Sequence, residues 1–238
     1  MNTESLCMLV IGIGLVVYCT IHSLLASMWM KNKIAKRCPG LMPAYRLMFA
    51  ALAVLLLIPL TWLLHRFPGP LLWSWKGPWF WVANLLALLA AIGFLWAGRS
   101  YDLQEFIGIR QWRTRAKSVD DQEQFRISYL HRFVRHPWYF FILVILWTRD
   151  VRAADLVMYT VITLYLVIGS QLEERTLLAY HGDAYRRYRE RVPGLIPLPW
   201  RYLNRTGAAE LVKLGHRRKR RTRDEAPAGE TGGIPEIR

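Results

Sequence analysis

The sequence predicts an all-α protein, a polytopic membrane bundle of about five transmembrane segments with a C-terminal helical hairpin and a cytosolic amphipathic helix. Long uncharged runs are the first observation, since 53% of the 238 residues are hydrophobic. The second is a formal net charge of +15, concentrated between and after these runs. A soluble nucleic-acid-binding protein can be equally basic but lacks such apolar runs, so nucleic acid is not an expected partner.

The apolar runs define the expected spans, because a hydrocarbon core about 30 Å thick is crossed by about 20 helical residues. Three runs approach this length, a fourth is shorter, and a fifth follows a charged turn: residues 6–30, 45–64, 79–97, 137–147 and 153–172. The fourth run is marginal alone, so we expect it to form a hairpin with the fifth, tilted or only partly inserted. His22 and Asn84, polar residues within these runs, are expected to form hydrogen bonds inside the bundle.

Basic residues are distributed unevenly among the loops. They are concentrated in residues 31–46, in residues 99–135 and after residue 172, whereas residues 65–77 and the hairpin turn carry few. Cytoplasmic loops of membrane proteins carry an excess of Lys and Arg. The distribution therefore predicts an N-terminus outside the membrane and a C-terminus in the cytosol.

We expect three regions along the chain: a three-helix membrane region (1–97), a core that contains the hairpin (98–204), and a basic, disordered tail (205–238). The stretch 213–223 contains seven Lys or Arg residues. A basic segment beside a membrane is typical of binding to anionic lipid headgroups, at about 1 kcal/mol per basic residue. The three cysteines have neither the spacing of a disulfide framework nor that of a metal site, so no metal is expected.

Two groups of residues mark where chemistry is expected, and the first is Arg135-His136-Pro137-Trp138-Tyr139 at the cytosolic entry to the hairpin. Pro137 suits the first turn of a helix, and it favours an extended backbone at His136, beside the positive N-terminal end of that helix. From these residues alone, His136 is equally a capping residue or a headgroup contact.

The second group follows the fifth apolar run. Glu173 and Glu174 stand at its cytosolic end. Tyr185, Tyr188 and Arg191 follow at spacings of three residues, so they form one stripe of a short helix. From spacing alone, an aromatic stripe with an arginine favours packing and snorkelling over ligand binding.

Together the two groups are more specific than either alone. The pattern Arg-His-Pro-x-Tyr, an apolar hairpin, then Glu-Glu-x-x-Leu-x-x-x-x-Gly-x-x-Tyr-x-x-Tyr-x-x-Arg-Val-Pro-x-x-x-Pro runs from Arg135 to Pro197. It resembles the isoprenylcysteine carboxyl methyltransferase family, whose superfamily also contains phospholipid N-methyltransferases and bacterial methanethiol S-methyltransferases. The resemblance covers roughly a quarter of the chain.

The resemblance implies a membrane-embedded enzyme, in a bacterial inner membrane, with a cytosol-facing pocket for S-adenosyl-L-methionine. The implied cofactor contacts are His136, Pro137, Trp138, Tyr139, Glu174 and Tyr188, with Gln111 as a further candidate. We expect the catalytic residues to be Glu174 and Arg191, the latter because the family uses the matching arginine near the substrate and the methyl group. The implied acceptor is small or lipophilic and presents a thiol, a carboxylate or an amine.

General chemistry agrees with these assignments. Aromatic faces and a carboxylate bind a sulfonium cation, and Tyr139, Tyr188 and Glu174 supply both. Methyl transfer is an in-line displacement, so positioning of the nucleophile provides most of the acceleration. Arg191 is suited to orienting an anionic nucleophile.

Three residues around the inferred pocket depart from the family pattern. Phe141 stands where many relatives have glycine, and His131 and His181 also replace residues common in relatives. These changes leave open a divergent acceptor or a loss of activity. Two other functions also stay open: an NADPH-dependent membrane reductase of related fold and a non-catalytic membrane scaffold.

Overall fold

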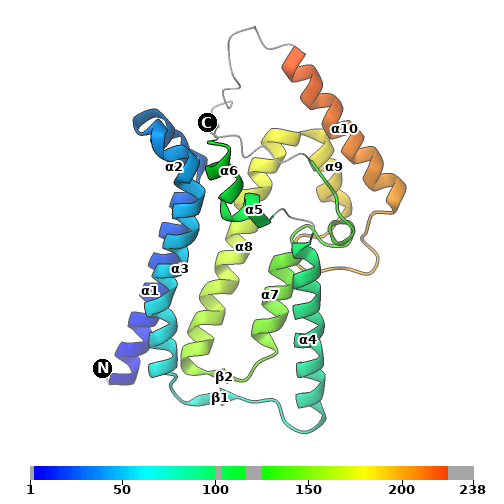
Figure 1. Ribbon diagram of the computed structural model, residues 1–238. Coiled ribbons are helices and arrows are strands. Elements are labelled where there is room, and N and C mark those ends of the chain that lie inside the picture. The colour runs from blue at the N-terminus through cyan, green and yellow to red at the C-terminus, as the bar shows by residue number, and fades with distance from the viewer. Residues whose placement is uncertain (1–2, 100–102, 116–124, 225–238) are drawn as a thin grey trace. The chain divides into compact units, whose positions relative to one another are not determined.

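The computed structural model describes residues 3–99, 103–115 and 125–224, which form almost only helices (Figure 1). Four of these helices are long and apolar enough to cross a membrane: α1 (Thr3–Ala26), α3 (Met42–Arg66), α4 (Pro78–Gly98) and α8 (Ala153–His181). A shorter apolar helix, α7 (Pro137–Trp147), has 11 residues. The prediction of an all-α polytopic fold is confirmed, and the chain is an integral membrane protein.

The chain divides into two compact units. The first comprises residues 1–121 and 138–168, and the second comprises residues 122–137 and 169–238. Helix α8 contributes its first part to the first unit and its C-terminal part to the second. This division differs from the boundaries predicted at residues 97 and 204, because the segment before α7 packs with the chain that follows α8.

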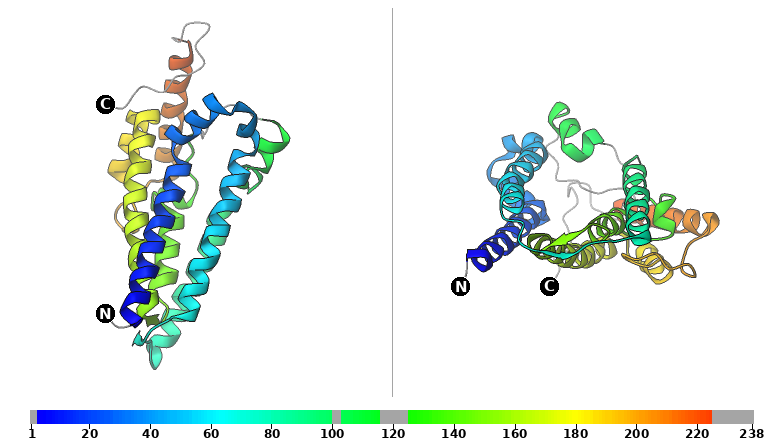
Figure 2. Two further views of the ribbon diagram at one scale, coloured as in Figure 1. Left: turned by 90° about the vertical axis from the view of Figure 1, so that its left-hand side faces the viewer. Right: turned by 90° about the horizontal axis from the view of Figure 1, so that it is seen from below.

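Helices α1 and α3 lie side by side in the first unit (Figures 1 and 2). Ile11, Leu15 and Leu60 form the buried centre of their contact, together with Ala154 at the start of α8. A Cβ atom at Gly12 would lie 3.3 Å from Val157 Cγ1, so the glycine allows α1 and α8 to approach closely. Many large apolar side chains of the spans are exposed, as expected for surfaces that face lipid.

The first apolar run is interrupted where the sequence predicts a continuous span as far as residue 30. Helix α1 ends at Ala26, and α2 (Met28–Arg37) begins after Ser27. Ser27 Oγ accepts a hydrogen bond from the Met30 backbone N–H at 3.3 Å, so it is the N-cap of α2. A 3-10 turn, η1 (Pro39–Leu41), then leads into α3.

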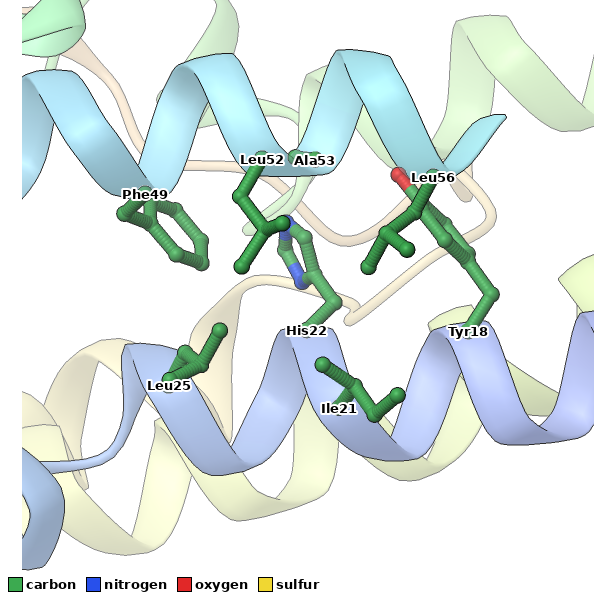
Figure 3. Close-up of a pocket in the computed structure, with 8 residues that line it drawn as sticks. All are labelled: Tyr18, Ile21, His22, Leu25, Phe49, Leu52, Ala53 and Leu56. Carbon is green, nitrogen blue, oxygen red and sulfur yellow. The ribbon is translucent and has the colours of Figure 1, made fainter. Parts of the chain in front are cut away.

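His22 of α1 lies in a small pocket lined mostly by apolar side chains of α1 and α3 (Figure 3). Its Nδ1 atom is 3.0 Å from the Tyr165 hydroxyl of α8, and Ser23 Oγ donates to the same hydroxyl at 3.3 Å. The Phe49 ring packs against the imidazole with centroids 4.9 Å apart. The prediction that His22 is a hydrogen-bonded residue of the bundle is confirmed.

The turn between α7 and α8 contains a short strand, β2 (Val151–Arg152), which pairs antiparallel with β1 (Leu71–Trp73). Neither strand was expected from the sequence. Arg149, in the same turn, donates from Nη1 to Asn84 Oδ1 of α4 at 3.0 Å. The interhelical role predicted for Asn84 is confirmed.

Helix α7 packs against α4 through Phe141. A Cβ atom at Gly93 would overlap the Phe141 ring, so the ring occupies the space that this glycine leaves. The phenylalanine that replaces a glycine of the family pattern is therefore matched by a glycine on the neighbouring helix. This packing gives the departure at Phe141 a structural explanation.

The second unit contains the end of α8 with α9 (Asp183–Arg191) and α10 (Arg205–Asp224), which pack against each other (Figure 1). Gly182 follows α8 with a φ of 53°, a conformation that favours glycine, and the chain reverses there into α9. The core of the unit consists of buried residues from both helices and the segments beside them: Phe125, Ala184, Tyr185, Tyr188, Val192, Leu203, Ala208 and Leu211.

The disordered tail predicted from residue 205 differs from the structure, in which residues 205–224 form α10. Ala208, Leu211 and Val212 lie on one face of this helix and pack into the core of the second unit. The prediction of disorder was based on the many basic residues of this segment, and net charge does not show that its few apolar residues share one face of a helix. Residues 225–238 lie outside the described residues.

Candidate active site

The first predicted motif is joined to the last by backbone hydrogen bonds within the second unit. Arg135 N donates to the Pro193 carbonyl at 2.9 Å, and His136 N donates to the Gly194 carbonyl at 3.1 Å. The extended backbone that Pro137 favours at His136 makes this pairing available. The segment before α7 and the segment after α9, distant in sequence, therefore form one local structure.

Glu174, near the C-terminal end of α8, is bound through a single carboxylate oxygen. Arg135 Nη2 and Nε lie 2.7 and 2.8 Å from Oε1, and His136 Nε2 lies 3.1 Å from the same atom. Charge-assisted hydrogen bonds of this kind are among the stronger ones in proteins. Within residues 125–224, no hydrogen bond or ion pair engages Oε2, so this oxygen is an available acceptor.

Arg135 also fastens the loop after α9. Its Nη1 donates to the Arg189 carbonyl at 2.9 Å and makes a short hydrogen bond to the Val192 carbonyl. The guanidinium thus donates hydrogen bonds both to the Glu174 carboxylate of α8 and to backbone carbonyl groups at the end of α9. Its side chain is only 12% exposed, which limits competition from water for these bonds.

His136 is buried between two carboxylates. Its Nε2 faces Glu174 Oε1, and its Nδ1 lies 3.5 Å from Glu173 Oε2. The side chain is 6% exposed, so it is not a superficial headgroup contact. Of the predicted site residues, the structure brings His136 and Glu174 into direct contact.

The two tyrosines of α9 are both buried, but their hydroxyl groups differ. Tyr188 Oη donates to the His131 carbonyl at 2.7 Å, and the Tyr188 ring packs against Phe125 with centroids 6.0 Å apart. The Tyr185 hydroxyl is buried and has no hydrogen-bond partner among the described residues. Burial, and secondly the negative charge of Glu174, raise the pKa of Tyr185 above its ordinary value. This phenol therefore stays protonated and is suited to act as a donor.

His131 supports Tyr188 from the 3-10 turn η2 (Leu130–Arg132). Its Nδ1 lies 2.7 Å from Ser128 Oγ. Burial, and secondly electrostatic interaction with His136, lower the pKa of His131 to about 4, so its imidazole is neutral at physiological pH. The departure from the family pattern at this position is therefore a half-buried histidine whose backbone carbonyl accepts the hydrogen bond from Tyr188.

Arg191, the predicted catalytic arginine, is exposed at the C-terminal end of α9. Its Nη1 lies 3.7 Å from the position that a Cβ atom would take at Gly207. Across the described residues of the chain, no hydrogen bond or ion pair occupies its guanidinium. Arg191 is therefore available for an anionic group, although its catalytic role stays a prediction.

Three predicted cofactor contacts belong to the first unit, whereas Pro137 is buried in the second. Trp138 stacks on Phe94 of α4 and meets Phe106 of α5 (Leu103–Ile107) edge-on, both with centroids 5.6 Å apart. Tyr139 follows in α7 and is half-buried. Gln111, in α6 (Ile109–Arg113), donates from Nε2 to the Glu105 carbonyl at 3.1 Å.

Arg135 and Tyr185 have no individual role among the predicted site residues. The sequence does contain an indication for Arg135. The first motif has an arginine beside a histidine, the second has two adjacent glutamates, and these two pairs are complementary in charge. Tyr185 lies one helical turn before Tyr188 on the same stripe. Helical spacing therefore does not predict which of the two hydroxyl groups forms a hydrogen bond. Among the described residues, no cluster of His, Cys, Asp and Glu is arranged to hold a metal ion.

No family model and no solved structure matches the chain. Among curated proteins it is similar to methanethiol S-methyltransferase of a Pseudomonas species, with 28% identity over 208 residues, 82% of this chain and 75% of that protein. It is 31% identical to methanethiol S-methyltransferase 2 of Bradyrhizobium diazoefficiens over 186 residues, 74% of this chain and 68% of that protein. The chain belongs to the isoprenylcysteine carboxyl methyltransferase-like family.

A shorter and more similar stretch supports the same assignment. Methanethiol S-methyltransferase 1 of Bradyrhizobium diazoefficiens is 40% identical over 79 residues, which cover 33% of this chain and 27% of that protein. The family predicted from Arg135 to Pro197 is confirmed, and so is the prediction of an enzyme. This member of the isoprenylcysteine carboxyl methyltransferase-like family is a membrane methyltransferase.

Proposed function

We propose that this methyltransferase uses S-adenosyl-L-methionine and methylates a small thiol at the cytosolic face of a bacterial inner membrane, with its N-terminus outside and its C-terminus in the cytosol. The names of the relatives favour a thiol over the carboxylate, amine and larger lipophilic acceptors. The single observation that carries the proposal is the Glu174 carboxylate, bound through Oε1 by Arg135 and His136 while Oε2 is available.

The residues around Glu174 fit a ligand with hydrogen-bond donors and positive charge. Oε2 is a fixed acceptor because Oε1 is anchored. Gly194 keeps the neighbouring space clear, since a Cβ atom there would lie 3.2 Å from Arg135 Nη2 and 3.7 Å from Glu174 Oε1. S-Adenosyl-L-methionine carries an ammonium group, ribose hydroxyl groups and a sulfonium, and when bound it supplies an activated methyl group.

Arg191 is proposed to orient the acceptor as its thiolate. A guanidinium stays charged at all physiological pH values, and it binds anions through several donors. The small thiol would first lose its proton to water, and the thiolate sulfur would then form a bond to the methyl carbon as the bond from that carbon to the sulfonium breaks, so the products would be a thioether and S-adenosylhomocysteine. Because the displacement needs little acid–base help, these residues contribute mainly by positioning.

The test is calorimetric titration of the purified full-length protein with S-adenosylhomocysteine. We expect Glu174→Gln to weaken binding by roughly tenfold or more, since it replaces a charged acceptor. Arg191→Ala is expected to bind S-adenosylhomocysteine normally but to lose most transfer of labelled methyl groups to a small thiol. Glu210→Gln, an exposed change on α10, is the matched control.

Failure of the wild-type protein to bind S-adenosylhomocysteine in every detergent tested would overturn the proposal. Equal labelling of a prenylated cysteine or a lipid amine would overturn the assignment of the acceptor. Competition by NADPH for the same site would favour the reductase, for which Arg186, Arg187 and Arg189 are the basic candidates. Normal cell behaviour of an Arg191→Ala strain would favour the scaffold.

A further inference from the structure

A second feature of the second unit is an open groove between the segment before the active site and α10. It has a volume of about 360 Å³ and is open to solvent. Ile127, Tyr129 and Arg132 line one wall, and Arg205, Ala208 and Val212 line the other. The groove is formed by residues to which the proposed methyl transfer assigns no role.

Arg132 is held in place before any ligand binds. Its Nε donates to the Leu203 carbonyl at 2.8 Å. The guanidinium carbon lies 5.5 Å from the centre of the Tyr129 ring and 5.6 Å from that of Phe133, within the range of cation–π attraction. Because these contacts already restrict the side chain, little rotamer entropy remains to be lost when it binds an anion.

Arg205 is the first residue of α10 and is exposed. In the part of the chain that the structure describes, neither Arg205 nor Arg132 forms an ion pair with a carboxylate. Among residues 125–224, the groove therefore carries two guanidinium groups that are not paired with a carboxylate. Its remaining walls are mainly apolar, with Ile127, Ala208 and Val212.

We propose that this groove binds an anionic phospholipid, with the phosphate between Arg132 and Arg205 and the glycerol and first acyl carbons against the apolar wall. Two guanidinium groups are complementary in charge and geometry to a phosphate. An apolar wall beside them suits an amphiphile better than a free inorganic anion. The unit is joined covalently to the membrane span α8, so such lipids are the abundant anions nearby. The proposal is independent of the methyl acceptor.

The test is a titration of the purified full-length protein, in detergent, with dioctanoyl phosphatidylglycerol, followed by thermal unfolding and native mass spectrometry. We expect this lipid to bind and to raise the unfolding temperature, and dioctanoyl phosphatidylcholine to do neither. Arg205→Glu should weaken phosphatidylglycerol binding by roughly tenfold or more, since it reverses one charge of the pair. Arg132→Lys, which keeps the charge but loses the Nε bond to Leu203, should weaken it less.

The matched control is Arg187→Glu, the same charge change at an exposed position of α9 outside the groove. Equal effects of Arg187→Glu and Arg205→Glu would overturn the proposal, because only the net charge would then matter. Equal binding of phosphatidylcholine would also overturn it. Full competition by millimolar inorganic phosphate would replace the lipid with a soluble phosphate as the ligand.

Discussion

Two partly buried arginines, one in each unit, differ in their partners: one stabilises the fold through neutral groups, and the other positions a carboxylate that is available to a ligand. Arg149 of the first unit meets neutral acceptors, the Asn84 side chain at 3.0 Å and the Ala83 carbonyl at 3.3 Å. Arg135 of the second unit meets the Glu174 carboxylate at 2.7 Å and two backbone carbonyls. Both arginines tie elements together that are distant in sequence.

The difference lies in what each arginine leaves available. Asn84 also donates to the Phe80 carbonyl, so its amide is used in both directions within α4 and the hairpin. Glu174 retains an oxygen that no described residue engages. A polar contact between an arginine and neutral acceptors, as at Arg149, stabilises the fold, whereas a contact that fixes a carboxylate and leaves one of its oxygens open prepares a ligand site.

The largest effect is expected for Arg135→Ala, which leaves the largely buried Glu174 charge without its main partner. Removing one member of a buried pair costs about 3–5 kcal/mol. We expect a clear fall in unfolding temperature and loss of S-adenosylhomocysteine binding, measured by thermal unfolding and calorimetry. Arg135→Lys keeps the charge but not the forked geometry, so its unfolding temperature and its affinity for S-adenosylhomocysteine should lie between those of the wild type and of Arg135→Ala. Unchanged affinity in Arg135→Ala would contradict a positioning role for this residue.

Acidification is expected to weaken the second unit through His131. Its pKa is about 4 in the folded chain and about 6.5 in an unfolded one, so the unfolded chain binds the proton first. The free energy of unfolding should therefore fall as the pH drops from about 6.5 to about 4, by about 3 kcal/mol in total. Thermal unfolding across this range tests it, with His131→Gln as control. A pH dependence that is the same in both proteins would contradict the assignment.

A smaller effect is expected for Arg149→Gln, which removes hydrogen bonds to neutral groups and no carboxylate partner. The loss is about 1–3 kcal/mol, the cost of leaving buried acceptors unpaired. We expect a lower unfolding temperature and an unchanged dissociation constant for S-adenosylhomocysteine. A large change in that constant would show that the two arginines do not differ as the comparison suggests.

The smallest effect is expected for Tyr185→Phe, and it should have the opposite sign. The substitution removes a buried hydroxyl that has no described partner, so the ligand-free protein should be as stable or up to about 1 kcal/mol more stable. Tyr188→Phe is the matched control, because it loses the bond to the His131 carbonyl and should be destabilised by about 1 kcal/mol. Thermal unfolding of both variants without ligand decides between these outcomes; destabilisation by Tyr185→Phe would mean that its hydroxyl is already satisfied.

Much of the membrane architecture could be predicted because apolar length is a direct requirement of the bilayer. Residues 45–64, 79–97 and 153–172 all lie within α3, α4 and α8. The end of α1 before Ser27 could not be predicted from hydropathy, because the residues on both sides of Ser27 are apolar. The feature that marks the start of α2 is the capping hydroxyl of Ser27, which does not change the hydropathy of the run. Helix α10 was missed because few of its residues are apolar, and only the packing of Leu211 and Ala208 shows that its folding is favourable.

For the candidate site, the motifs indicated which segments meet but not how. The pairing of His136 with Glu174 follows from two motifs that the family resemblance joined. The anchoring of that carboxylate by Arg135 depends on backbone pairing with Pro193 and Gly194, which residue types do not reveal. The environments of Tyr185 and Tyr188 differ through burial of single atoms, a property that helical spacing cannot distinguish.

The backbone pairing of residues 135 and 136 with residues 193 and 194 also sets an order of events during synthesis. Pro193 follows Arg135 by 58 positions, and the membrane helices α7 and α8 lie between them. At roughly 5–20 residues per second, the ribosome delivers the second half of this pairing roughly 3–12 seconds after the first. Phe125 packs with Tyr188 and Leu203, which are synthesised later, so the core beside the candidate site is completed only after both hairpin helices have been made.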